Sequence, residues 1–171
     1  MTKLLLSVHV LAAILVVGPI AVAASLFPRH ARQAASGGGG PRERDAGVAA
    51  VLHRICRGYA VVGVAVPVFG IATGAQLGVL TDAWLVVSMA LTALAAALLV
   101  LAIVPGQRRM IEAAVTAPGT GAGGEAGGGG DAAGGTRSAA ARLAMLTGVF
   151  NLLWAVVVVL MIVRPGSTTG A

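Results

Sequence analysis

Residues 83–104 read AWLVVSMALTALAAALLVLAIV, a run of 22 residues without a charged side chain. A helix of about 20 apolar residues crosses the hydrocarbon core of a bilayer, whereas a surface helix of a soluble protein keeps one polar face. Three further runs of this kind occupy residues 4–27, 59–80 and 143–163, and they contain 24, 22 and 21 residues. The sequence therefore predicts four transmembrane helices.

The overall composition indicates the same class of protein. Of the 171 residues, 57% are hydrophobic and 11% are charged, against roughly 45–50% and about 25% in soluble domains. Unpaired backbone amides are not tolerated in hydrocarbon, and continuous apolar runs differ from the alternating strands of an outer-membrane barrel. We expect an all-α membrane protein, a four-transmembrane-helix bundle that forms a single domain over residues 1–171.

The connections between the four spans are of two kinds. Only Thr81 and Asp82 separate the second span from the third, which predicts an antiparallel hairpin. The segments 31–47 and 117–140 contain Gly-rich runs and too few apolar residues to offset the entropy of ordering them. We expect both segments to be flexible linkers. Neither contains the GxxxxGK[ST] pattern of a phosphate-binding loop.

The basic residues lie mostly on one side of the predicted membrane. Lys3 and Arg164 flank one side, while ten arginines lie in or beside the two long connections on the other. These ten are Arg29, Arg32, Arg42, Arg44, Arg54, Arg57, Arg108, Arg109, Arg137 and Arg142. Cytoplasmic loops are enriched in Lys and Arg, so we expect an inner (cytoplasmic) membrane protein with both long loops in the cytoplasm and both termini outside.

Two alternatives to this interpretation of the charge are weaker. A net charge of +6 would suggest nucleic-acid binding in a soluble protein, but no aromatic residues interleave with these arginines, so we expect contact with lipid headgroups and no nucleic-acid partner. The first 23 residues also resemble a cleavable signal peptide. Cleavage there would export the arginine-rich first connection, against the charge rule.

Polar groups within the spans are few and mostly small. No Asp, Glu, Lys or Arg lies in the four runs, so a carboxylate-driven pump is not expected. We expect Asn151 in the fourth span to hydrogen-bond between helices. In the second span, Pro67 predicts a kink, and Gly63, Gly70 and Gly74 predict close packing with a neighbouring helix.

His9 is the only imidazole inside a span, and burying it costs free energy unless it is hydrogen-bonded or bound to a metal. The interpretation that we favour is an interhelical hydrogen bond to Ser88, Thr73 or Gln76. The alternative is that His9 binds a cofactor, haem or copper. The second axial ligand at the depth of His9 would then be a methionine, either Met89 or Met161.

The other potential ligands do not complete such a site. Helical rise separates His53 from His9 by roughly 27 Å, so the two rings cannot share one metal. We expect His53 and His30 to be surface groups on the basic side. The single Cys56 excludes an intramolecular disulfide.

Several short motifs resemble a known family. Residues 4–14 (LLLSVHVLAAI), 82–85 (DAWL), 105–109 (PGQRR) and 160–166 (LMIVRPG) together resemble a bacterial family of four-helix predicted integral membrane proteins of unknown function. The first helix is also distantly similar to the His-bearing first helices of copper-resistance-D-like and protoporphyrinogen-oxidase-like membrane proteins. That second resemblance implies copper or haem chemistry and transfers to this chain only through His9.

The sequence thus leaves three hypotheses of different classes. The first is a non-enzymatic membrane protein that acts through helix packing, as a homo-oligomer or with a membrane protein partner. The second is a haem- or copper-handling membrane module centred on His9. The third is an oligomeric channel for small solutes. A Soret band in the purified protein would separate the second hypothesis from the first.

Overall fold

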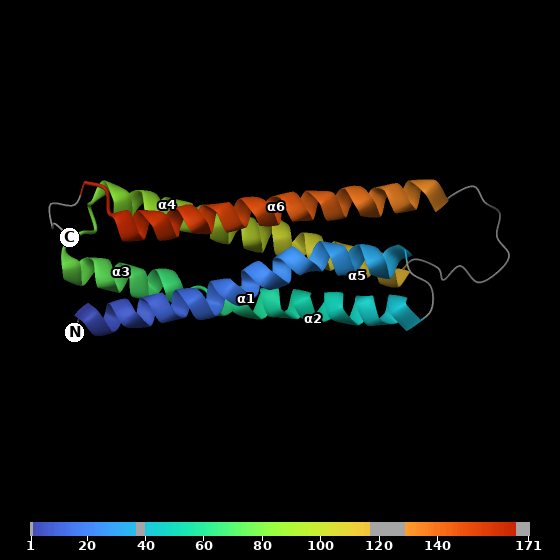
Figure 1. Cartoon of the computed structure of the whole chain (residues 1–171), viewed down its shortest axis with the longest axis horizontal. Helices are drawn as coiled ribbons and strands as arrows, with labels where there is room; N and C mark the ends of the chain where they lie inside the picture. The colour runs from blue at the N-terminus through green and yellow to red at the C-terminus, as the bar shows by residue number, and fades with distance from the viewer. Residues whose placement is uncertain (1, 37–39, 117–128, 167–171) are drawn as a thin grey trace.

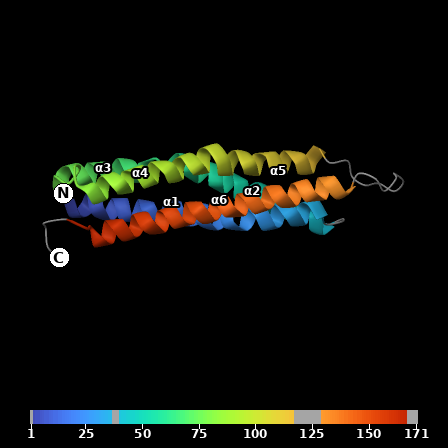
Figure 2. The same ribbon diagram turned by 90° about the horizontal axis from the view of Figure 1, so that it is seen from above.

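The computed structural model describes residues 2–36, 40–116 and 129–166, and all the regular structure in these ranges is helical. The elements are α1 (Thr2–Ser36), α2 (Gly40–Val62), α3 (Ala65–Leu77), α4 (Ala83–Leu98), the π-helical segment η1 (Leu99–Ile103), α5 (Val104–Thr116) and α6 (Gly129–Val163). They form four rods, namely α1, α2–α3, α4–η1–α5 and α6, which lie side by side in two perpendicular views (Figures 1 and 2). The all-α four-helix bundle is confirmed.

The two ends of the bundle are of different character. The N- and C-terminal ends and the turn between α3 and α4 lie at one end, which we call the hairpin end (Figure 1). The last turn of α1, the first turn of α2, the end of α5 and the start of α6 lie at the other, which we call the loop end. Both long connections therefore leave the bundle from the loop end.

Each rod is long and apolar enough to cross a membrane. The four candidate spans are Lys3–Ser36, Gly40–Leu77, Ala83–Thr116 and Gly134–Val163, of 34, 38, 34 and 30 residues. At 1.5 Å per residue, these helices measure about 45–57 Å, whereas the hydrocarbon core of a bilayer is about 30 Å thick. The bundle is longer than a membrane is thick. Because the apolar runs reach the hairpin end, the excess length is a helical extension at the loop end.

This extension corrects the expected linker boundaries. Residues 31–36 and 40–47 belong to α1 and α2, and residues 129–140 belong to α6, so these parts are helical. The remaining parts, residues 37–39 and 117–128, lie outside the described ranges. Low apolar content predicts disorder only for a segment considered by itself. A segment that continues an existing packed helix does not have to nucleate a helix, and alanine, which is frequent in residues 31–36 and 129–140, has the highest helix propensity.

The pairing of α1 with α2 and α3 fixes a register that the sequence did not predict. Nδ1 of His30 on α1 lies 2.8 Å from Oδ1 of Asp45 on α2. Because α1 and α2 run antiparallel, Phe27, three residues before His30, lies near the level of Val48, three residues after Asp45. Val48 is eleven residues, or about 16 Å, before Tyr59. One membrane plane perpendicular to the bundle cannot pass through both Phe27 and Tyr59. The predicted inner ends of the first two spans are therefore not at the same depth.

Proline interrupts two of the rods. The break between α2 and α3 falls at Gly63 and Val64, one turn before Pro67, whose ring excludes the carbonyl of residue i−4 and which has no N–H to donate. The carbonyl of Gly63 instead accepts from the N–H of Val66 at 3.1 Å. The structure thus shows an interruption of the helix before Pro67, where the sequence predicts a kink. In the other rod, the π-helical segment η1 ends two residues before Pro105, and the helix continues as α5.

The best-packed part of the bundle lies between its middle and the loop end. Phe27, Cys56, Ile103 and Phe150 come from four different rods and are at most 1% exposed. Towards the hairpin end the packing opens, because α3 packs mainly on α1 while α4 packs on α6. The helices α3 and α4 contact each other little, although only a short turn joins them.

Candidate functional site

His9 is buried between α1 and α3, as its position in an apolar run requires. It is 9% exposed, and its Nδ1 lies 3.0 Å from the backbone carbonyl oxygen of Val66. A carbonyl only accepts hydrogen bonds, so Nδ1 carries a proton, and in the neutral ring Nε2 then has the free lone pair. The predicted interhelical hydrogen bond is present, but its acceptor is a backbone atom.

The expected side-chain partners of His9 are engaged elsewhere, which corrects that part of the prediction. The hydroxyl of Thr73 donates to the carbonyl of Phe69 at 2.7 Å, and that of Ser88 donates to the carbonyl of Trp84 at 2.8 Å. Gln76 is exposed. Small hydroxyls in a helix satisfy themselves on the preceding turn, so they are not obliged to meet the imidazole.

Gly70 makes the approach of His9 to α3 feasible. A Cβ atom at Gly70 would lie 2.9 Å from Cε1 and 3.3 Å from Nδ1 of His9, so a side chain at this position would overlap the ring. The predicted close packing at Gly70 and Gly74 is confirmed, since a Cβ atom at Gly74 would lie 2.9 Å from Cδ2 of Leu85. At both glycines the neighbour that fills the space is a side chain.

The fit of a metal or haem to His9 is partial. Ligating histidines commonly donate their second N–H to a carbonyl, and His9 does this through Nδ1. Of the proposed axial methionines, Met89 is 41% exposed. Within residues 2–36, 40–116 and 129–166, no group of three or more His, Cys, Asp or Glu residues could hold a metal ion. The structure thus offers one nitrogen ligand there and no assembled site.

The two other histidines are not the surface groups that we expected. His53 is partly buried, and its Nδ1 donates to Oε1 of Gln107 at 3.2 Å, while Nε2 of Gln107 lies 3.5 Å from Sγ of Cys56. Gln107 is 1% exposed, so α2 and α5 share a buried polar contact. His30 is also partly buried, and it bonds to Asp45. Both corrections follow from the helical extension, which brings residues assigned to loops into a packed bundle.

Polar groups of α6 lie along one face in the middle of the bundle. The amide of Asn151 donates to Oγ of Ser25 on α1 at 3.3 Å, which confirms the predicted interhelical bond. Oγ1 of Thr147 and Nε1 of Trp154 are buried without a hydrogen-bond partner in the part of the chain that the structure describes. Trp154 lines a cavity of about 160 Å³, which is below the size of typical ligand sites but large enough for water.

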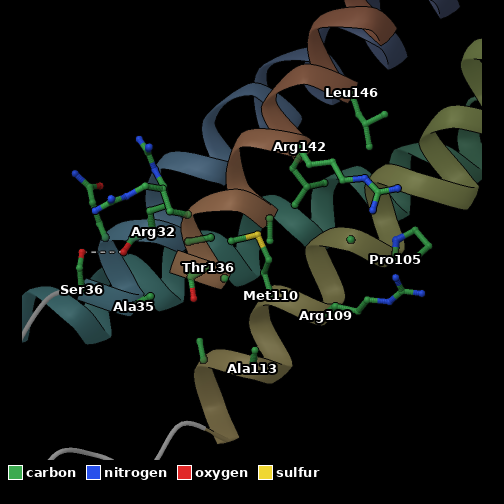
Figure 3. A pocket seen from close by; sticks show the side chains of 18 of the residues that line it. Arg32, Ala35, Ser36, Pro105, Arg109, Met110, Ala113, Thr136, Arg142 and Leu146 are labelled. Atoms are coloured by element: carbon green, nitrogen blue, oxygen red, sulfur yellow. Dashed lines mark hydrogen bonds between the residues drawn. The ribbon is translucent and has the colours of Figure 1, made fainter. Parts of the chain in front are cut away.

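A larger cavity opens at the loop end, and sequence reasoning did not predict it. Its volume is about 1070 Å³, and its walls come from α1, η1, α5 and α6 with one residue of α2 (Figure 3). Five of its lining residues are arginines, namely Arg32, Arg42, Arg109, Arg137 and Arg142. Among the described residues that line it, none is an Asp or a Glu. We call it the arginine-lined cavity.

The apolar part of the arginine-lined cavity is formed where α5 and α6 pack closely. A Cβ atom at Gly106 would lie 3.0 Å from Cδ2 of Leu143, so these two helices meet at Gly106. Leu101, Leu143 and Leu146 line the same region. In the sequence, the four-residue spacing of Leu101, Pro105 and Arg109 is the pattern that could have indicated this cavity. The spacing places these residues on one face of a helix, but only if residues 105–116 are helical, which the sequence did not predict.

Comparisons with protein-family models, with curated proteins and with solved structures found no match. The resemblance to four-helix bacterial membrane proteins therefore rests on the short motifs quoted above. The structure contributes to it only the four long apolar helices.

Proposed function

We propose that this protein is a non-enzymatic membrane protein with four spans, and that it acts through helix packing with a second copy of itself or with another membrane protein. The hydroxyls of Ser25, Thr73, Ser88 and Thr92 donate to carbonyls of their own helices, so none of these four protons needs a ligand as its acceptor. This pattern supports a packing protein over a transporter, since polar and ionisable groups usually mark a transport pathway.

The observation that carries this proposal is the open side between α3 and α4. These helices meet near the turn that joins them, where Leu85 lies over Gly74, and they diverge further along the bundle. Val64, which precedes α3, lines the same small cavity as Thr92 of α4 and is 62% exposed. Val68 on α3 and Leu94 on α4 are also exposed, by 56% and 55%. In a membrane, such a surface contacts either lipid or another helix.

Cross-linking in the native membrane tests this proposal. Val68→Cys and Leu94→Cys would each be introduced into a Cys56→Ser background, with Leu152→Cys on α6 as the control. We expect cross-linked species from Val68→Cys and Leu94→Cys but not from Leu152→Cys. Equal cross-linking at all three positions, or at none, would contradict packing through the α3–α4 side.

We further propose that the loop end faces the cytoplasm and that the protein lies in the inner membrane. The support is the charge asymmetry, since ten of the twelve basic residues lie in or beside the two long connections in the sequence. The register set by His30 and Asp45 places two of these ten, Arg54 and Arg57, nearer the middle of the bundle. Lys3 and Arg164 are the exceptions, and both belong to the hairpin end.

A second candidate function is haem or copper binding at His9. One observation favours it, namely the bond from Nδ1 of His9 to the carbonyl of Val66, which orients the ring as in known ligating histidines and leaves Nε2 as a donor of electrons to a metal. Absorbance at the Soret band and copper analysis of the purified protein test this candidate. Absence of both from protein purified out of cofactor-replete cells would contradict it.

A further inference from the structure

We propose that the arginine-lined cavity binds the phosphate group of an anionic ligand, and that the shape of the cavity favours the headgroup of a membrane phospholipid as its source. This inference goes beyond helix packing and does not depend on it. It rests on three observations, namely the charge of the cavity, the helices that supply its arginines, and the position of its apolar part.

The first observation is an excess of positive charge without carboxylates. Three acidic residues with described side chains lie at the loop end, and none of them lines the cavity. Asp45 bonds to His30 at 2.8 Å, Glu112 bonds to Arg108 at 2.7 Å, and Glu43 is exposed on the first turn of α2. Within the described ranges, no ion pair is formed by the five arginines that line it. Guanidinium groups bind phosphate through paired hydrogen bonds, so the missing counter-charge is of the kind that a phosphate supplies.

The second observation is that the arginines come from different helices and line one space. Arg32 belongs to α1, Arg109 to α5, and Arg137 and Arg142 to α6. Figure 3 shows Arg109 and Arg142 on one side of the cavity and Arg32 on the other. A ligand between them would be contacted from several helices, whereas arginines spread evenly over a surface would each contact it separately.

The third observation concerns depth. Leu101 and Leu146 lie within the apolar runs 83–104 and 143–163, whereas Arg142 and Arg109 lie one and five residues beyond the ends of those runs. These offsets correspond to about 1.5 and 7.5 Å along the helices. The cavity is therefore apolar at membrane depth and basic just beyond it. A phospholipid has this same order, since its acyl chains lie below its phosphate.

Leu101 supports access from the lipid side. It is 76% exposed and lines the cavity, so the apolar part opens towards the surface of the bundle. Basic pockets between transmembrane helices on the cytoplasmic side are known to bind anionic lipid headgroups. A soluble phosphate ligand would use the arginines and leave the leucines without a function.

The alternative is a diffuse attraction between loop-end arginines and anionic lipid, without a site. That attraction depends on the number of basic residues near the membrane surface, whichever residues carry the charge. The chain offers a matched control, because Arg29 of α1 and Arg44 of α2 are exposed basic residues towards the loop end that do not line the cavity. The comparison is between the double variant Arg109→Gln/Arg142→Gln and the control Arg29→Gln/Arg44→Gln.

The experiment measures the thermal unfolding midpoint of the full chain in a non-ionic detergent at fixed ionic strength. The added probes are dioctanoyl phosphatidylglycerol, dioctanoyl phosphatidylcholine and inorganic phosphate. We expect phosphatidylglycerol to raise the midpoint of the wild type and of the control variant at similar concentrations. The cavity variant should need at least about tenfold more, because each charge-assisted hydrogen bond lost weakens binding by roughly that factor or more.

The arms of this experiment separate the outcomes. Stabilisation by phosphatidylglycerol but not by inorganic phosphate identifies a lipid site, and stabilisation by inorganic phosphate with the same dependence on Arg109 and Arg142 identifies a soluble phosphate ligand. Equal losses in the two double variants, no loss in either, or equal stabilisation by phosphatidylcholine would overturn the proposal. If the cavity double variant aggregates, the single variants Arg109→Gln and Arg142→Gln are compared with Arg44→Gln in the same assay.

Discussion

At the scale of single residues, the contact between His9 and Gly70 shows how a buried imidazole is accommodated in an apolar helix pair. The ring lies against α3 where no side chain is present, and Nδ1 donates to the carbonyl of Val66. The ring and the glycine depend on each other. The bond satisfies one nitrogen, and the space at Gly70 allows α1 and α3 to approach.

Substitution of His9 distinguishes hydrogen bonding from metal ligation. The side-chain amide nitrogen of Asn occupies nearly the position of the imidazole Nδ1, so His9→Asn should keep the bond to Val66, whereas His9→Leu should lose it. We expect His9→Leu to be less stable by about 0.6 kcal/mol, the average for such bonds in membranes. Thermal unfolding in detergent measures this difference. Stoichiometric haem or copper in the wild type that is absent from His9→Asn would instead establish the cofactor function.

Gly70→Ala tests the close approach directly. The added methyl group would overlap the imidazole of His9, so we expect a loss of about 1–3 kcal/mol in the free energy of unfolding. Gly58→Ala is the matched control, because nothing lies within 4 Å of a Cβ atom there, and it should be neutral or slightly stabilising. Unfolding of both variants in the same detergent gives the comparison, and equal stability of the two would refute the predicted overlap.

The burial of His9 could be predicted from the sequence, but its hydrogen-bond partner could not. Every residue has a backbone carbonyl, so the amino-acid type of Val66 gives no indication that its carbonyl accepts a hydrogen bond from His9. Reasoning from polar side chains therefore led to Thr73, Ser88 and Gln76. The same limit applies to the arginine-lined cavity. Its arginines were counted by side of the membrane, but their common face depends on helical phase in segments that we assigned to loops.

At the scale of secondary-structure elements, the four spans and the interruption before Pro67 could be predicted because hydropathy and proline act locally. The ends of the spans could not, because they depend on pairing between helices. Buried alanines such as Ala31, Ala34 and Ala49 allow α1 and α2 to remain packed beyond the apolar runs. Low apolar content therefore did not end these helices.

A deletion between α5 and α6 tests the remaining part of the linker prediction. Residues 119–124 contain no charged residue and no large apolar residue, and the length of a connection adds only slowly to the entropy of closing it. We expect their removal to leave membrane insertion unchanged and the free energy of unfolding within about 0.5 kcal/mol of that of the wild type. Membrane fractionation and thermal unfolding measure these two quantities. Loss of the protein from the membrane fraction would show that this segment contributes to folding or to a partner interface.

At the scale of the whole molecule, the bundle is asymmetric in length and in charge. The hairpin end closes near the ends of the apolar runs, with Arg164 stacked over the Trp84 ring at 5.7 Å and the indole of Trp84 donating to Asp82 at 3.1 Å. The loop end continues as helices that carry most of the arginines. A chain built in this way presents its basic surface, and the arginine-lined cavity, to only one leaflet.

The orientation of this asymmetric bundle is the last prediction. Loop ends rich in arginine are retained in the cytoplasm during insertion, so Thr116 should face the cytoplasm and Thr81 the opposite side. Both residues are exposed, and Cys56 is fully buried, so Thr81→Cys and Thr116→Cys in a Cys56→Ser background give single reporters. In intact cells, an impermeant thiol reagent should label Thr81→Cys and not Thr116→Cys, and permeabilised cells should label both. The opposite pattern in intact cells would reverse the orientation, and it would place the arginine-lined cavity at the outer leaflet, where the anionic lipids that it fits would have to be sought.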